Sequence, residues 1–148
     1  MLTRRSLLGL LAASPLVAKP AFAASPEVFS DGSGAIRGTD PVAYFTKGMP
    51  VAGGAAHSLM WRGAEWLFET AENMALFETN PAAYAPQYGG YCAFALSKGS
   101  LASTDPNAWT IHEGKLYLNY SVNVRTIWSE DIPGNIMKAD ANWPSVLG

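Results

Sequence analysis

The chain contains a single cysteine, Cys92, whose position allows chemistry as well as packing. Cys92 follows Gly89-Gly90 and opens a stretch, residues 91–98, that is predicted to be helical. The partial positive charge at the start of a helix favours the thiolate, the form that binds soft metals or acts as a nucleophile. The alternative is that Cys92 is a small core residue between Tyr91 and Phe94, as lone free cysteines often are.

The only imidazoles are His57 and His112. A Cu(I) site could combine Cys92 with His57, because thiolate, imidazole and thioether groups all suit copper. The methionines available to such a site are Met49, Met60, Met74 and Met137. A thiol enzyme or redox sensor that uses Cys92 with a histidine is a further alternative, although no hydrolase signature surrounds the cysteine.

A metal-free hypothesis rests on three tyrosines near the Gly89-Gly90 pair. Tyr84, Tyr88 and Tyr91 could form an aromatic surface that binds a partner protein or a small ligand. The competing interpretation is that these rings pack in the core around the glycine turn.

Two β-hairpins are predicted to form the sheet of the protein, each with a two-residue turn that ends in glycine. The turns are Arg62-Gly63 and Glu113-Gly114. The strands are predicted over residues 57–61 and 64–69, and over 109–112 and 115–120. The predicted cross-strand pairs are Trp61–Ala64, Leu59–Trp66, His57–Phe68 and Ile111–Leu116. We expect the two hairpins to join into one four-stranded antiparallel sheet.

Short helices fill the remaining sequence, and their starts are marked by capping residues. The expected N-caps are Asp40, Thr70, Ser121 and Asp131. Helices are predicted over residues 42–46, 71–79, 91–98 and 122–130, and from 131 onward. The fold class is therefore α+β: a small single domain in which an antiparallel sheet of two β-hairpins packs with three to four short helices.

The first 23 residues are typical of an export signal. Thr3-Arg4-Arg5-Ser6-Leu7-Leu8 is a twin-arginine pattern, an apolar run extends to Val17, and Ala21-Phe22-Ala23 is a small-x-small cleavage site. We expect residues 1–23 to be cleaved and the mature protein to be periplasmic. Residues 24–38 are predicted to be a partly irregular lead-in.

Composition limits what the mature chain can do. Of the 10 basic residues, Arg4, Arg5 and Lys19 are removed with the signal. The mature chain then has 7 basic and 12 acidic residues, and its net charge is about −5. An acidic chain without a basic cluster is a poor nucleic-acid binder. No segment after the signal is predicted to cross a membrane, and one cysteine excludes an internal disulfide.

A series of motifs resembles the YHS domain family, in particular a group of exported bacterial YHS-domain proteins. The matching motifs are Gly38-Thr39-Asp40-Pro41-Val42-Ala43-Tyr44-Phe45, Trp61-x-Gly63-x-x-Trp66-x-Phe68, Asn80-Pro81-x-x-Tyr84, Gln87-Tyr88-Gly89-Gly90-Tyr91-Cys92 and Gly114-Lys115-Leu116-Tyr117. The resemblance covers most of residues 36–144 and makes 39–148 a YHS-like domain. It implies a compact α+β module linked to heavy-metal handling, with copper the metal expected.

The sequence departs from the family at the metal-binding cysteines. In cysteine-bearing members these follow Asp-Pro-Val and lie in a Phe-Cys-x-x-x-Cys segment. The matching positions here are Ala43, Glu69 and Asn73. Because three thiolates are missing, a copper site would depend on Cys92 and His57. We therefore expect a periplasmic binding module associated with copper handling, without assigned catalysis.

Overall fold

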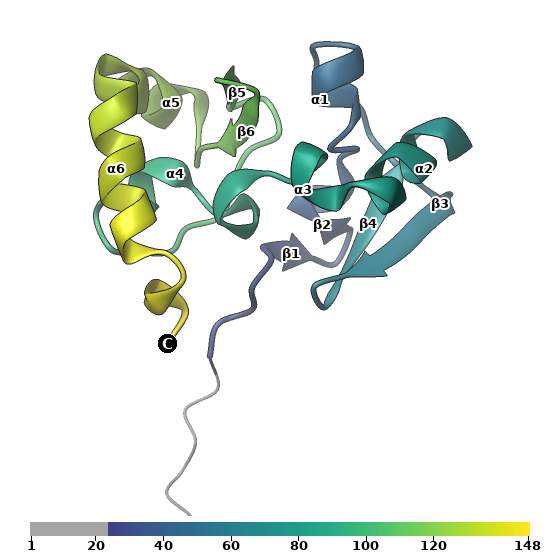
Figure 1. The fold of residues 1–148 in the computed structure, drawn as a ribbon, viewed down its shortest axis with the longest axis horizontal. Coiled ribbons are helices and arrows are strands. Elements are labelled where there is room, and N and C mark those ends of the chain that lie inside the picture. The colour runs from purple at the N-terminus through teal and green to yellow at the C-terminus, as the bar shows by residue number, and fades with distance from the viewer. Residues whose placement is uncertain (1–23) are drawn as a thin grey trace, which may run out of the picture.

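The computed structural model describes residues 24–148, and the predicted export signal, residues 1–23, lies outside them. The fold is α+β, as predicted: short helices surround three small antiparallel sheets of two strands each (Figure 1). The strands are β1 (Ser30–Asp31), β2 (Gly34–Ala35), β3 (Gly54–Trp61), β4 (Ala64–Phe68), β5 (Trp109–His112) and β6 (Lys115–Leu118). The α-helices are α1 (Ala43–Thr46), α2 (Ala71–Thr79), α3 (Pro81–Tyr84), α4 (Ala93–Ser97), α5 (Val122–Trp128) and α6 (Ile132–Asn142). The 3-10 turns are η1 (Ile36–Gly38), η2 (Gln87–Gly90), η3 (Ser129–Asp131) and η4 (Ser145–Leu147).

The β3–β4 hairpin forms as predicted at its turn and departs from the prediction at its far end. Trp61 pairs with Ala64 and Leu59 with Trp66. The predicted pair of His57 with Phe68 is wrong, because the register shifts between Gly54 and Ser58 and Gly54 lies opposite Phe68. The chain approaches β4 closely here, since a β-carbon on Gly53 would overlap the backbone of Leu67. His57 therefore falls in the irregular part of β3.

The β5–β6 hairpin has the predicted register, with Ile111 opposite Leu116. The expected four-stranded sheet is wrong, because β3–β4 and β5–β6 are hydrogen-bonded only within themselves. Strand β6 is instead covered by side chains on both faces. Leu116 and Leu118 belong to one hydrophobic cluster and Tyr117 belongs to the other.

Two hydrophobic clusters form the core on either side of β6. The first cluster includes the rings of Trp66 and Phe68, which pack at a tilt against Phe77 with centroids 5.1 and 5.2 Å from its own. The second cluster includes Trp128 and Tyr117, with ring centroids 5.4 Å apart. The helices α4 and α6 pack together around this second cluster (Figure 1).

Three of the four predicted N-caps are confirmed. The fourth, Asp40, lies two residues before the observed N-cap Val42, and its carboxylate accepts the N–H groups of Val42 and Ala43. The side chains of Thr70, Ser121 and Asp131 accept hydrogen bonds from the backbone N–H three residues later, each at 3.1 Å. Helix α4 is shorter than predicted, because Tyr91 has an extended backbone and Cys92 is the N-cap, so the helix begins at Ala93. Within residues 24–148, no helix has the length and apolar character needed to cross a membrane.

Candidate ligand-binding pocket

Cys92 lies at the N-terminus of α4, as predicted, but its sulfur is enclosed. The residue is 1 % exposed. Its Sγ accepts a hydrogen bond from the Tyr120 N–H at 3.2 Å and lies 3.5 Å from the Asn119 Oδ1, to which the thiol can donate. A thiol enzyme would need this sulfur to meet its substrate, and the native packing covers it.

His57 is not a neighbour of Cys92. It lies in β3, whereas Cys92 opens α4, and Figure 1 draws these two elements on opposite sides of the molecule. Among residues 24–148, no three His, Cys, Asp or Glu side chains come together as a metal site would require. The two residues expected to share a copper ion are therefore separated by the fold.

The positions that match the family cysteines do come together, around a carboxylate. Asp40 is fully buried and accepts hydrogen bonds from the Ala43 N–H at 3.3 Å and the Glu69 N–H at 2.9 Å. It also accepts one from the Asn73 side-chain amide at 2.8 Å. The Glu69 carboxylate points to Lys47, with Oε2 2.8 Å from Nζ. These residues form a hydrogen-bond network without a soft ligand.

The three tyrosines do not share one surface. Tyr84 packs edge-on against Phe45, with ring centroids 5.5 Å apart. Tyr88 and Tyr91 are 5 % and 8 % exposed, and both belong to the second hydrophobic cluster. The Tyr91 hydroxyl donates to the Pro26 carbonyl at 2.7 Å, which gives this side chain a structural role. Burial raises the pKa of the Tyr91 hydroxyl above its usual value. Tyr88 alone lines the pocket described next.

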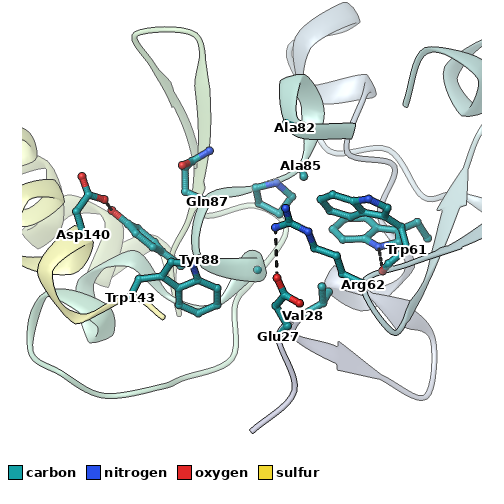
Figure 2. A pocket seen from close by; sticks show the side chains of 13 residues that line it. Glu27, Val28, Trp61, Arg62, Ala82, Ala85, Gln87, Tyr88, Asp140 and Trp143 are labelled. Atoms are coloured by element: carbon teal, nitrogen blue, oxygen red, sulfur yellow. Dashed lines mark hydrogen bonds and ion pairs between the residues drawn. The ribbon is translucent and has the colours of Figure 1, made fainter. Parts of the chain in front are cut away.

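A pocket of about 240 Å³ lies where the lead-in, the β3–β4 turn, the α3–η2 segment and the end of α6 meet (Figure 2). Its apolar walls and its polar groups come from these four separate parts of the chain. The lining residues that are used below are Glu27, Trp61, Arg62, Tyr88, Asp140 and Trp143. The lining combines aromatic rings with a few polar and charged groups, as ligand pockets commonly do.

One wall of the pocket holds an arginine, an indole and a carboxylate in contact. The guanidinium carbon of Arg62 lies 4.3 Å from the ring centroid of Trp61. One of its nitrogens lies 3.4 Å from Oε1 of Glu27, and Figure 2 draws this ion pair as a dashed line. Both side chains are about half exposed, at 51 % and 50 %.

The facing wall holds two aromatic rings and a second carboxylate. The rings of Tyr88 and Trp143 meet nearly at right angles, at 66°, with centroids 6.1 Å apart. The Tyr88 hydroxyl donates to Oδ1 of Asp140 at 2.9 Å. Burial, followed by this hydrogen bond, raises the pKa of Tyr88 well above its usual value, so the hydroxyl stays protonated and continues to donate.

The turn η2 positions Tyr88 through an unusual backbone. Tyr88 and Gly89 have φ values of 59° and 63°, in the left-handed region that non-glycine residues rarely adopt. The carbonyl of Gly89 accepts the Phe29 N–H at 2.9 Å, which fixes the lead-in beside the turn. The Gly89-Gly90 pair signalled a turn in the sequence. Local spacing gave no signal for Glu27, Arg62, Asp140 and Trp143, because these residues meet only through the fold.

No protein-family model, curated protein or solved structure matches this chain.

Proposed function

We propose that the protein is an exported binding module that holds a small ligand in the pocket between the β3–β4 turn and the end of α6. The observation behind this proposal is the lining itself. Aromatic rings and three charged side chains (Glu27, Arg62 and Asp140) line one cavity, and the lining contains no cysteine or histidine. Such a combination favours recognition of a ligand over its chemical conversion.

We propose a periplasmic location for this module on the basis of the leader. The twin-arginine pattern, the apolar run and the small-x-small site occupy residues 1–23, and the described domain begins directly afterwards. Its use of a single buried cysteine is compatible with an oxidising compartment, because no second thiol is present in the chain.

The pocket proposal predicts that small ligands bind with the Trp143 ring as one wall. We expect members of a library of single-ring compounds to perturb the Trp143 indole resonance and the backbone amide resonances of Arg62 and Gly89 in NMR spectra of the mature protein, and these amides remain as probes when Trp143 is replaced. Replacing Trp143 by alanine should weaken these ligands about tenfold or more, because a large aromatic contact is lost.

Two further variants test whether this loss is specific. Trp143→Phe keeps a ring and should retain much of the affinity, and Tyr120→Ala removes an aromatic side chain that is 57 % exposed and outside the pocket. Tyr120→Ala should leave binding unchanged. Ligands that bind Trp143→Ala as tightly as the wild type would show that the pocket is not the binding site.

We place copper handling second among the proposed functions. The YHS resemblance implies it, and Cys92 is the single thiol of the chain. Against it stand the burial of the sulfur and the distance of His57 from it. A thiolate with no companion ligand holds a soft ion weakly.

This ordering predicts little metal in the purified protein. Elemental analysis of mature protein isolated without chelators should find copper far below one ion per chain, also after loading with Cu(I) under reducing conditions. Near-stoichiometric copper that disappears in Cys92→Ser would reverse the order of the two functions. Copper that persists in that variant would point to ligands other than Cys92.

A further inference from the structure

We infer that the ligand of this pocket is a small organic cation, with an ammonium or guanidinium group on a compact body. The inference rests on the proposed function and names the chemical class that the site selects. Three features of the pocket support it: its charge balance, a cation that the protein itself places there, and its size.

The charges in the lining leave one carboxylate uncompensated. Arg62 is paired with Glu27, so these two side chains cancel. Asp140 receives the Tyr88 hydroxyl, but no Lys, Arg or His within residues 24–148 lies within 4.0 Å of its carboxylate. The pocket therefore carries a net negative charge beside aromatic rings, which attracts a cation.

The wall of the pocket opposite Asp140 already holds a cation between an aromatic ring and a carboxylate. There the Arg62 guanidinium lies against the Trp61 ring and beside the Glu27 carboxylate. Tyr88, Trp143 and Asp140 present the same combination of aromatic rings and a carboxylate on the facing wall (Figure 2). In the described chain, Arg62 is the cation beside Trp61 and Glu27. No Lys, Arg or His side chain of the described chain takes the equivalent place beside Asp140.

The Tyr88–Asp140 hydrogen bond strengthens the second site. A phenol that donates to a carboxylate has a more electron-rich ring, and an electron-rich ring attracts a cation more strongly. The ligand must also be small. An apolar cavity of about 150 Å³ can hold benzene, so the 240 Å³ pocket suits one ring with a short charged arm.

The test compares three probes of nearly equal size that differ in charge. Benzylamine is a cation at neutral pH, benzyl alcohol is neutral and benzoate is an anion. NMR titration of the mature protein, followed at the Trp143 indole, gives each dissociation constant. We expect benzylamine to bind about tenfold more tightly than either of the other two probes.

The variant Asp140→Asn separates charge from shape, because asparagine keeps the size of the side chain and an oxygen for the Tyr88 hydroxyl. It should weaken benzylamine about tenfold and change benzyl alcohol by less than about twofold. Asp131→Asn is the matched control, since Asp131 is an exposed carboxylate at the start of α6 and outside the pocket. It should leave all three constants unchanged.

The possible failures are distinguishable. Equal binding of benzylamine and benzyl alcohol would overturn the cation inference and leave the pocket as a binding site. Tighter binding of benzoate would overturn it in favour of an anion held by Arg62. If none of the probes moved a resonance of the pocket residues, and the ligand library also failed, the proposed function would fall with the inference.

Discussion

Replacing Asp40 by asparagine is expected to lower the free energy of unfolding by about 3 kcal/mol or more. One oxygen of the buried carboxylate accepts the N–H groups of Val42 and Ala43, at 2.8 and 3.3 Å. The other accepts the Glu69 N–H and the Asn73 amide, at 2.9 and 2.8 Å. An asparagine amide must turn its NH₂ group toward one of these donor pairs, whichever way it is placed. Two buried donors then lose their acceptor.

Urea unfolding of the mature protein measures this loss. Asp131→Asn is the matched control, since Asp131 is an exposed N-cap and asparagine caps helices equally well. That control should change the free energy of unfolding by less than about 0.5 kcal/mol. A similar small change in Asp40→Asn would mean that the Asp40 carboxylate does not organise the junction of α1, β4 and α2.

The second large effect is expected at Gly89, where alanine should lower the free energy of unfolding by about 3 kcal/mol or more. A β-carbon at this position would overlap the carbonyl oxygen of Glu27. The backbone there also has φ of 63°, which costs an L-residue free energy even in open space. The lead-in would have to move away, so the hydrogen bond from Phe29 to Gly89 and the Glu27 side of the pocket would be lost.

Gly48→Ala separates the steric overlap with Glu27 from the strain of a positive φ. Gly48 has nearly the same backbone, with φ of 65°, and nothing lies within 4 Å of a β-carbon placed on it. Its replacement should cost about 1 kcal/mol, from backbone strain alone. Urea unfolding gives both free energies, and hydrogen exchange at the Phe29 amide reports the release of the lead-in. Equal effects of the two substitutions would show that the lead-in does not depend on Gly89.

The parts of the fold that local chemistry determines were predictable from the sequence. The turns at Arg62-Gly63 and Glu113-Gly114 set the registers beside them, and Thr70, Ser121 and Asp131 cap the helices that they precede. The sequence did not reveal the bulge in β3. The strand was predicted to begin at residue 57, and only the approach of the preceding segment to Leu67 shows why glycine is needed at position 53.

The site was less predictable, because it is made of contacts between distant segments. Tyr88 was considered either as part of an aromatic binding surface or as a core residue; most of its ring is buried, and its hydroxyl binds Asp140. The pair of Glu27 and Arg62 links the lead-in to a hairpin turn, and no local pattern relates the two residues. For Cys92 the sequence predicted a position near a helix start and left open whether the thiol is reactive or packed in the core, and the structure shows it packed in the core.

Strand β6 couples the unfolding of the two hydrophobic clusters. Its alternating side chains reach into both hydrophobic clusters, Leu116 and Leu118 into one and Tyr117 into the other. Phe29 also packs against both clusters. Neither cluster can lose its packing without withdrawing side chains from a strand that supports the other. The two halves should therefore melt in a single cooperative transition, although no sheet connects their hairpins.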